Sequence, residues 1–583
     1  MVGAELIAFE SFADLFGQQL RFEELCESLS GFSRNSVLWV CSYIGVSLQL
    51  WNRNSDDSPN VEYLINVFFE PRLAQRLLLR RQFLSEGKRV VFHRRQLLFL
   101  AKLALSHCTD QGVNAAVQSR SFGLLFLHAN DHFHFDLLPT MAKGEFSRKD
   151  LAKAMVELLA AEEYSHAEIP NIFVRSRMMC LTLPERLRGH SDYLNIEDLF
   201  RKKHHFEIRL FQQLAFGISS RFGENTAAKL RAEPYLLPIR HSDFATTQVD
   251  PKDIQYFFDL VSSTPPSLSR HASLLRRDEG FRSRWASDAT VFRQKPLMLQ
   301  WFEVGTYSTY VGFLLMDHYF LLQKVLSEPY FLGIGVAPKG FARFWGAIFE
   351  EYIHDFMKQS TNHEVNCYVR NPRIVGVSNK ELCDAAVICG DSLLLLEYKS
   401  AIIRADHKYN GDPVALTKEI SEKFVYDTKD NNPKAVTQLS TAVKTLFGGD
   451  VQASVDWCDL SKIKRCYVLI VTLDTIGGAL GMSSLLNTYF KEQLTVETFE
   501  HVQVRPIFCT DVETLEMVSG CLKTTSFASI LERWYQANNL LSMPLASVRM
   551  DDLIPTRPAW LWEDWALFSE EATQGIFNKA LLN

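Results

Sequence analysis

The chain of 583 residues lacks several motifs that would place it in a well-known class of enzyme. It has neither a G-x-x-x-x-G-K-S/T loop, which holds nucleotide phosphates, nor a G-x-S-x-G turn, which presents a serine nucleophile. Its 11 cysteines are odd in number and form no C-x-x-C pair. The sequence therefore gives no sign of a Walker-type motor, and it predicts reduced thiols rather than a disulfide framework or a zinc ribbon.

A long apolar run and a basic N-terminal leader are also missing. The stretch "YVGFLLMDHYFLL" is interrupted by Asp317 and His318, so it falls short of the roughly 18 residues that indicate a membrane-spanning helix. The N-terminal stretch "MVGAELIAFESFADLF" carries Glu5 and Glu10 and no basic residue, unlike a signal peptide. We therefore expect a cytoplasmic protein that has no membrane partner.

An excess of positive charge is absent too, because the formal net charge is -6 at pH 7. A local basic groove can nevertheless lie on an acidic protein. The stretches "RLLLRRQFLSEGKRVVFHRR" and "SRHASLLRRDEGFRSRW" are rich in arginine, and each is either a solvated helix face or a patch that binds phosphates. We interpret "RKKHH", residues 201–205, as the exposed start of a helix.

The composition that is present, 47% hydrophobic and 22% charged, is typical of a globular protein. Residues 1–290 repeat apolar positions at three- and four-residue spacing, as in "RKDLAKAMVELLAAEEYSH", and predict a large, mainly α-helical region of one or two subdomains. Residues 291–545 alternate helical and strand-like segments, such as "KPLMLQWFEVG", and predict an α/β domain with a mixed central sheet flanked by helices. The Trp-rich tail, residues 546–583, is expected to pack on the body.

Two apolar runs joined by a tight turn contain the most informative charges, in "ELCDAAVICGDSLLLLEYKS", residues 381–400. The turn "CGDS" has the glycine and aspartate that favour a hairpin. Pairing outward from its centre places Asp384 opposite Glu397, and opposed residues share a face with Cβ atoms about 5 Å apart. Lys399 lies two positions beyond Glu397 and is expected on the same face.

Two opposed carboxylates repel each other unless a cation lies between them. Mg²⁺ prefers oxygen ligands and is usually held by one or two carboxylates together with phosphate and water. Lys399 could then orient the attacking water or offset negative charge on the phosphate. Asp384, Glu397 and Lys399 therefore predict a metal-dependent phosphodiester site at one edge of the sheet. The alternative is an exposed strand end with a surface ion pair that contributes little.

These residues resemble the PD-(D/E)xK nuclease superfamily, whose restriction-endonuclease-like core has a helix with a glutamate, a strand with an aspartate and a strand that ends in E-x-K. Here the E-x-K is Glu397-Tyr398-Lys399, and the aspartate is Asp384. Cys383 stands where the proline of the family name would be. The resemblance covers residues 335–515 or so, within the proposed nuclease domain of residues 291–545.

The resemblance also implies roles for residues on two helices. In "GAIFEEYI", Glu350 matches the helix glutamate, and Glu351 is the alternative. Gln438, in "AVTQLSTAV", is similar to a glutamine on the next helix in some branches of the family. By analogy, Glu350, Asp384 and Glu397 would bind Mg²⁺, for which Mn²⁺ can substitute, and Lys399 would position water. Gln438 would complete the catalytic set.

The activity implied by the resemblance is hydrolysis of phosphodiester bonds in nucleic acid, with DNA favoured over RNA. A long unfamiliar region fused to such a core is typical of anti-phage defence nucleases, so a phage or host trigger protein is an expected partner. The same fold also serves as an inactive scaffold. A catalytically silent nucleic-acid-binding or assembly protein therefore remains the alternative.

Overall fold

The structure is a computed structural model in which 17 stretches of the chain are described. They are residues 7–49, 60–83, 88–109, 120, 122–133, 168–223, 226–274, 288–304, 308–375, 381–409, 412–427, 431–448, 455–479, 481–494, 499, 501–537 and 558–576. The helix predicted in residues 148–166 lies outside these ranges, and so do residues 546–557 and 577–583 of the tail.

The first part of the chain is a layer of helices around the buried helix α6. Its helices are α1 (Phe12–Phe16), α2 (Phe22–Ser30), α3 (Arg34–Ser47), α4 (Val61–Phe68), α5 (Pro71–Phe83), α6 (Arg94–His107) and α7 (Phe122–Asn130). Two short strands, β1 (Ile7–Phe9) and β2 (Lys88–Val90), pair in parallel beside them. Helices α2, α3 and α7 contact α6, whose residues 94–105 are all buried. A helix buried on all sides needs such a surrounding layer.

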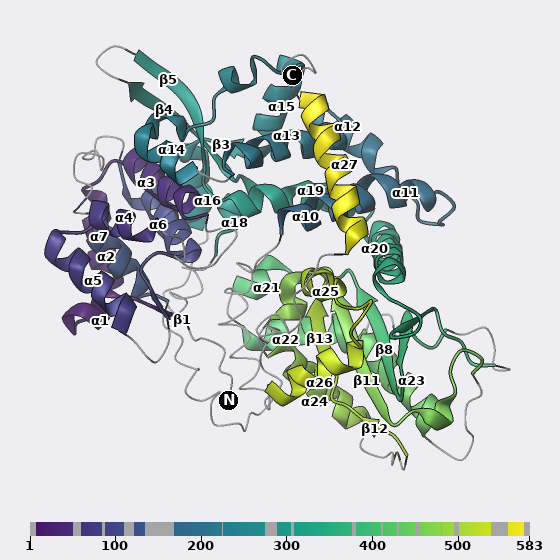
Figure 1. Ribbon diagram of the computed structural model, residues 1–583. Coiled ribbons are helices and arrows are strands. Elements are labelled where there is room, and N and C mark those ends of the chain that lie inside the picture. Colours follow the sequence, from purple (N-terminus) through teal and green to yellow (C-terminus); the bar gives the residue numbers. More distant parts are fainter. Residues whose placement is uncertain are drawn as a thin grey trace.

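A second group of helices follows and packs on a small sheet. Its helices are α10 (Ile169–Arg177), α11 (Leu183–Arg186), α12 (Ile196–His204), α13 (Ile208–Arg221), α14 (Thr226–Ala232), α15 (Pro251–Val261), α16 (Pro265–Leu274), α18 (Thr290–Gln294) and α19 (His318–Val336). The sheet has the order β3 (Ser262–Ser263), β4 (Leu297–Val304) and β5 (Ser308–Leu315). Figure 1 shows this sheet among the helices, away from the sheet of the C-terminal part.

The strand predicted in "KPLMLQWFEVG" is therefore present as β4, but it pairs with β5 and not with the strands around the E-x-K. The Ser42 hydroxyl on α3 donates a hydrogen bond of 2.8 Å to the carbonyl of Leu315 at the end of β5. Asp317 then begins α19, where its carboxylate accepts from the amide of Phe320 and pairs with buried Arg94. Residues 297–336, assigned to the C-terminal domain from the sequence, thus pack with the helical region.

The central sheet belongs to the C-terminal part and follows the long helix α20 (Pro338–Ser360). Its strands are β6 (Cys367–Arg370), β7 (Ala385–Cys389), β8 (Ser392–Lys399), β11 (Arg465–Thr472), β12 (Gln503–Val504) and β13 (Phe508–Asp511). The order is β12-β11-β8-β7-β6, and β13 also pairs with β11. Strands β6, β7 and β8 are antiparallel, whereas β11 is parallel to β8, β12 and β13.

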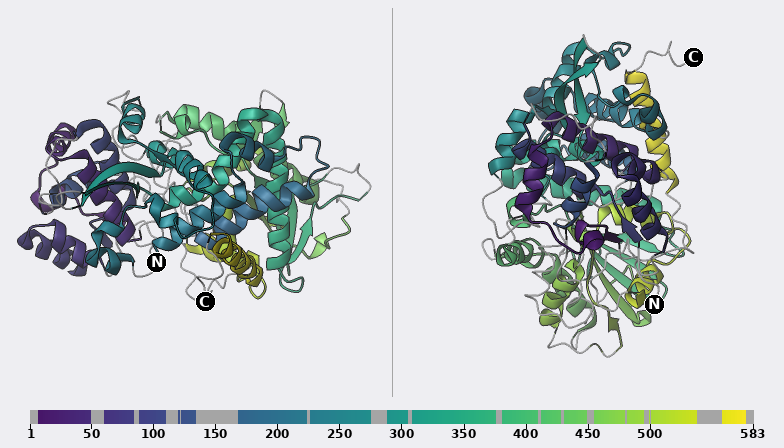
Figure 2. Two further views of the ribbon diagram at one scale, coloured as in Figure 1. Left: turned by 90° about the horizontal axis from the view of Figure 1, so that it is seen from above. Right: turned by 90° about the vertical axis from the view of Figure 1, so that its left-hand side faces the viewer.

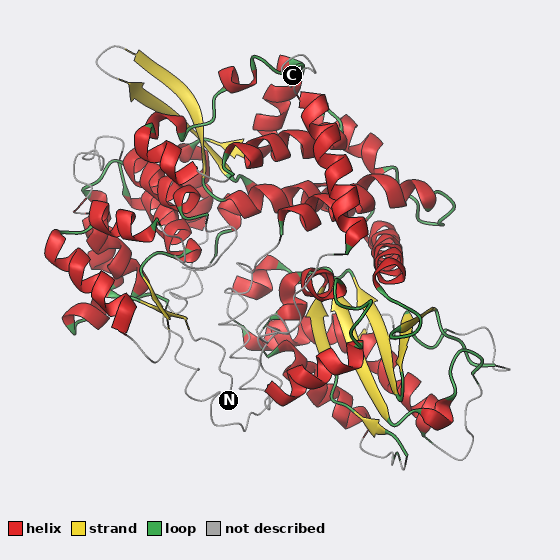
Figure 3. Cartoon of the chain, in the orientation of Figure 1, coloured by secondary structure: helices red, strands yellow, loops and turns green. Residues whose placement is uncertain are grey.

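Helices cover both faces of this sheet (Figure 3). On one face, α20, α25 (Val512–Ser519) and α26 (Phe527–Ala537) share a core with Leu394 and Leu396 of β8. On the other, α22 (Pro413–Ile420), α23 (Ala435–Phe447) and α24 (Met482–Leu494) share a second core with Leu393 and Leu395. Burial on both faces explains why β8 reads as an unbroken apolar run. The fold is α/β, with a mixed sheet flanked by helices. Short elements α21 (Ala405–Tyr409), β9 (Tyr426–Asp427) and β10 (Asn432–Pro433) complete this part.

Buried ion pairs join the helical region to the sheet-containing part, which lies below it in the right-hand view of Figure 2. Arg175 of α10 donates to Glu513 at 3.0 Å and to Glu516 at 2.9 Å, both on α25. The hydroxyl of Tyr352, on α20, donates to the same Glu516 at 2.7 Å. Arg175 thus ties α25 to the helical region, and Tyr352 of α20 shares the Glu516 carboxylate with it.

The described part of the Trp-rich tail forms α27 (Ala559–Ile576), which lies along α10 and α13 in Figure 1. The ring of Phe568 stacks on Phe173 of α10, with centroids 4.9 Å apart. Trp565 stacks on the same ring at 6.0 Å, and Arg177 pairs with Glu571. Within the described ranges, no helix combines the length and apolar character needed to cross a membrane.

Candidate active site

The β7–β8 hairpin sets the geometry of the site. Cys389 pairs with Ser392 on either side of the turn, so the register predicted from the sequence is confirmed. Gly390 has a φ of 61°, in the left-handed region that glycine adopts without strain. Asp384 immediately precedes β7, and in this register its position faces Glu397 on β8.

Hydrogen bonds hold three of the predicted residues at the end of β8. An Asp384 carboxylate oxygen (Oδ2) accepts from the backbone amide of Tyr398 at 2.6 Å. The neighbouring Glu397 side chain, 1% exposed, accepts at Oε2 from Lys399 Nζ, also at 2.6 Å. The Lys399 side chain is 19% exposed and marks the side from which the cluster can be reached.

Helix α20 brings Glu350 to this cluster. Burial raises the pKa of Glu350 to about 7, with a further contribution from the charge of Asp384, while Lys399 acts in the opposite direction. The adjacent Glu351 is instead engaged by arginines outside the cluster, Arg370 and Arg186. The helix therefore directs Glu350, and not Glu351, toward Asp384 and Lys399.

We call Glu350, Asp384, Glu397 and Lys399 the acidic cluster, because its carboxylates outnumber its one ammonium group. Burial raises the pKa of Glu397 to about 8; the charge of Lys399 opposes this rise, and Asp384 adds to it. Burial lowers the pKa of Lys399, but the charges of Glu397 and Asp384 outweigh burial and raise it overall. Both acids are thus costly to ionise mainly because they are buried, and the charge of Asp384 adds to that cost; a bound cation would offset both effects.

The oxygen donors of the acidic cluster fit Mg²⁺ by type, since one or two carboxylates suffice for this ion. Among the described residues, no group of three or more His, Cys, Asp or Glu side chains is arranged so that it could hold a metal ion. The Glu397–Lys399 ion pair occupies one of the carboxylate oxygens. Asp384 and Glu397 are therefore the two carboxylates of the cluster whose type would suit the ion, and Glu350 interacts with both through its charge.

Gln438 is the one predicted site residue that no interaction links to the acidic cluster. It lies half-buried on α23, the helix that packs on β8 and β11. Its side chain makes no hydrogen bond to any described residue. Glu381, which the sequence analysis did not select, adds to the raised pKa of Glu350 through its charge, unlike Gln438.

Of the two arginine-rich stretches, the first covers α5 and the start of α6, where Arg94 and Arg95 are 3% and 7% exposed. Arg94 pairs with Asp317, so this part of the stretch is interior and not a surface for phosphates. Most of the second stretch, residues 275–285, lies outside the described ranges.

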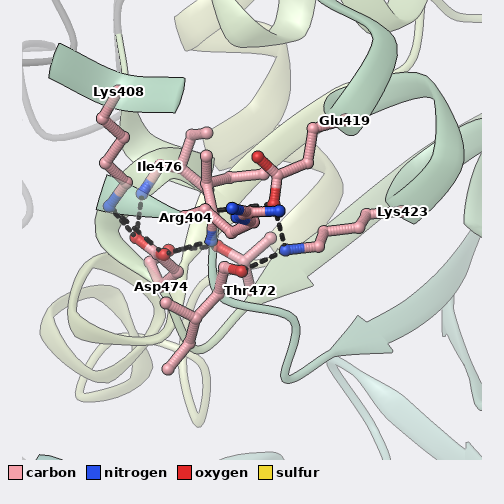
Figure 4. Close-up of polar contacts among 9 residues, drawn as sticks. Arg404, Lys408, Glu419, Lys423, Thr472, Asp474 and Ile476 are labelled. Atoms are coloured by element: carbon pink, nitrogen blue, oxygen red, sulfur yellow. Dashed lines mark hydrogen bonds and ion pairs between the residues drawn. The ribbon is translucent and has the colours of Figure 1, made fainter. Parts of the chain in front are cut away.

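A second polar network, absent from the sequence analysis, lies just beyond Lys399 (Figure 4). Asp474 follows β11, and its Oδ2 and Oδ1 accept from the amides of Ile403 at 3.0 Å and Ile476 at 3.1 Å. The ammonium of Lys408 lies 3.3 Å from the same carboxylate, and both side chains are 6% exposed. Asp474 therefore anchors the segment that leaves β8 and carries Lys408.

Glu419 on α22 anchors the same segment from the other side. Its carboxylate accepts from the amide of Arg404 at 3.2 Å, from His407 Nδ1 at 2.5 Å and from Lys423 Nζ. Lys423 also donates to the carbonyl of Ile402. We call Arg404, His407, Lys408 and Lys423, with Glu419 and Asp474, the basic cluster. The basic residues directly after E-x-K and the aspartate that ends the buried "YVLIVTLD" run were available signals for it.

Comparison of the chain with protein-family models, with curated proteins and with solved structures gives no match in any of the three.

Proposed function

We propose that the protein is a Mg²⁺-dependent nuclease that hydrolyses phosphodiester bonds, with DNA as the favoured substrate and RNA as the alternative. The observation that carries the proposal is the meeting of Asp384, Glu397 and Lys399 at the end of two adjacent antiparallel strands, with Glu350 supplied by the preceding long helix. The order helix, three antiparallel strands, helix and parallel strand supports the resemblance to the PD-(D/E)xK superfamily.

In this proposal the carboxylates bind the metal ion and the lysine contacts the phosphate. Asp384 and Glu397 would hold Mg²⁺ (or Mn²⁺), and Glu350 would bind it directly or through water. When bound, the ion supplies Lewis-acid polarisation of the phosphodiester and makes a coordinated water more acidic. Lys399 has a raised pKa and stays protonated, so its role is to donate hydrogen bonds and offset charge on the phosphate rather than to remove a proton.

The basic cluster supports a path for the nucleic-acid backbone beside the acidic cluster. The segment of residues 400–408 joins the two clusters directly. The exposed Arg404 adds a positive charge in the segment that follows Lys399. Phosphate groups are held by such basic side chains, and the contacts weaken as salt displaces them. The setting in anti-phage defence and a phage or host trigger protein remain parts of this proposal.

One observation favours the alternative of a catalytically silent nucleic-acid-binding or assembly protein. Glu397 is 1% exposed and closed by its ion pair with Lys399, and no three metal-ligand side chains converge within the described ranges. A scaffold that keeps the fold without the reaction would tolerate this closed state.

The test is cleavage by the purified full chain on panels of DNA and RNA with Mg²⁺, with Mn²⁺ and with EDTA. Asp384→Asn removes a charge that the ion needs, and we expect activity to fall at least about 1,000-fold, the order seen when a key electrostatic contact is lost. The matched control is Asp391→Asn, because Asp391 lies at the turn of the same hairpin and pairs with Arg465 at the surface.

The expected result is metal-dependent cleavage by the wild type and by Asp391→Asn, and none by Asp384→Asn. Equal cleavage by all three proteins would place the activity elsewhere, or in a contaminant. Binding of nucleic acid without cleavage in either metal, with and without phage or host extract, would favour the scaffold.

A further inference from the structure

A polar pocket of about 460 Å³ lies in the helical region, bounded by α12, α15, α18 and α19. Pockets of about 300 to 1,000 Å³ are of the size that holds small-molecule ligands. Its wall includes the "RKKHH" residues that the sequence analysis placed at an exposed helix start. That prediction is wrong: α12 begins at Ile196, capped by Asn195, and the basic residues form its last turn. Cations are favoured at that end by the helix dipole.

The pocket has more ammonium groups than carboxylates to match them. Lys324 donates to Glu328 at 2.6 Å, and that carboxylate also lies 3.2 Å from His204 Nε2. Lys295 instead donates to two neutral acceptors, the backbone carbonyls of residues 259 and 260, at 2.6 and 2.9 Å. Burial lowers the pKa of Lys295, and the charge of Lys324 lowers it further. An anion in the pocket would stabilise both lysines.

Two further side chains of the lining, Lys203 and Asp259, leave the pocket with an excess of positive charge. Lys203, exposed at the end of α12, makes no hydrogen bond or ion pair with any described residue. The Asp259 carboxylate also lines the pocket, but it accepts from Gln255 at 2.7 Å. Three lysines therefore face two carboxylates, and one of these acids is already hydrogen-bonded to an amide.

Part of the wall is aromatic and suits a flat ring. The rings of His205 and Tyr256 lie 5.2 Å apart, centroid to centroid, at an interplanar angle of 44°. Gln294, another lining residue, has an amide that makes no hydrogen bond to any described residue and can both donate and accept. Ring stacking and a free amide are the contacts with which proteins recognise a nucleobase.

We propose that this pocket binds a nucleoside phosphate, with the phosphate near Lys203 and Lys295 and the base against Tyr256 and His205. The inference does not depend on the proposed nuclease activity, because its readout is binding. Helix α19 carries Lys324 and Glu328 and packs on α20, which carries Glu350. Helix α19 thus contributes two residues to the ligand site and also contacts the helix that carries Glu350.

Isothermal titration of the full chain tests the proposal with the four common ribonucleoside diphosphates, adenosine and inorganic phosphate as probes. At least one diphosphate is expected to bind one to one and at least about tenfold more tightly than adenosine or phosphate alone. Lys203→Glu should weaken that diphosphate at least about tenfold, since it reverses a charge at the phosphate. Because Lys203 is exposed, this variant should keep the thermal unfolding temperature of the wild type.

The matched control is Lys202→Glu, the preceding residue on α12, which is exposed and does not line the pocket. It should leave the affinity within about twofold of the wild type, so that only the pocket-facing charge matters. The proposal is overturned if no diphosphate binds, if adenosine or phosphate binds as tightly, or if both variants weaken binding equally. It is also overturned if a single-stranded oligonucleotide, but no diphosphate, binds in a manner sensitive to Lys203→Glu.

Discussion

The acidic and basic clusters lie side by side at the end of β8, yet their charge balances are opposite. The acidic cluster has three carboxylates and one ammonium, whereas the basic cluster has two carboxylates and three cations, Arg404, Lys408 and Lys423. In the basic cluster, Asp474 and Glu419 accept from cations and from backbone amides at once. In the acidic cluster, burial raises the pKa of Glu350 and Glu397, and the charge of Asp384 adds to the rise of both.

This difference indicates two roles: the carboxylates of the basic cluster stabilise the fold, and those of the acidic cluster are available to bind a ligand. A buried carboxylate whose hydrogen bonds are complete contributes to structure, and its loss leaves its partners without acceptors. An ionised carboxylate that lies close to other carboxylates lowers the stability of the folded state unless it binds a cation or a proton. Three predictions test this comparison, beginning with the largest expected effect.

Asp474→Ala should destabilise the protein by about 3 to 5 kcal/mol, because it leaves the buried Lys408 ammonium without this carboxylate and removes the acceptor for two amides. Urea unfolding of the full chain measures the change. The surface variant Asp391→Ala, which breaks an exposed pair with Arg465, should cost about 1 kcal/mol or less. Equal losses for the two variants would mean that the basic cluster does not hold the segment after β8.

Lys399→Met should lower metal-dependent cleavage about 100-fold, since the phosphate loses a charged donor while the carboxylates remain. Lys399→Arg keeps the charge and should recover part of the activity. Lys464→Met is the control, because Lys464 is exposed at the start of β11, at the opposite end of the same sheet. Full activity in Lys399→Met would remove this lysine from the proposed mechanism.

The pH dependence of stability, measured in EDTA, should reveal the free-energy cost of burying ionised Glu350 beside Asp384. The pKa of Glu350 is about 7 in the folded chain, above its ordinary value of 4.5, so the folded state binds more protons between these values. Raising the pH from 5 to 8 should therefore destabilise the wild type by on the order of 1 to 3 kcal/mol more than Glu350→Gln.

Glu351→Gln is the control for this prediction, because Glu351 pairs with Arg370 and Arg186 outside the acidic cluster and is the last of the charges that raise the pKa of Glu350; it should change the slope far less than Glu350→Gln. Parallel urea midpoints for the wild type and Glu350→Gln across this pH range would contradict a raised pKa of Glu350 in the folded chain.

Local pairing made part of the site predictable. The turn residues of "CGDS" and the period of two along a strand determine the β7–β8 register, so Asp384 could be set opposite Glu397 without coordinates. The helical repeat likewise located α20 around "GAIFEEYI". The choice between Glu350 and Glu351 needed the position of Arg370, a residue on β6.

Contacts between distant segments could not be predicted in this way. The sequence pattern of a strand does not show which strand it pairs with. It could not predict that β4 pairs with β5 in a separate sheet, or that β11 lies parallel to β8. The basic cluster joins residues 403–408 to Asp474, about seventy positions later, and the polar pocket gathers side chains from four helices. The sequence alone determined the local elements and the hairpin, because neighbouring residues set them. Only the tertiary structure decided which charges meet, because packing brings those segments together.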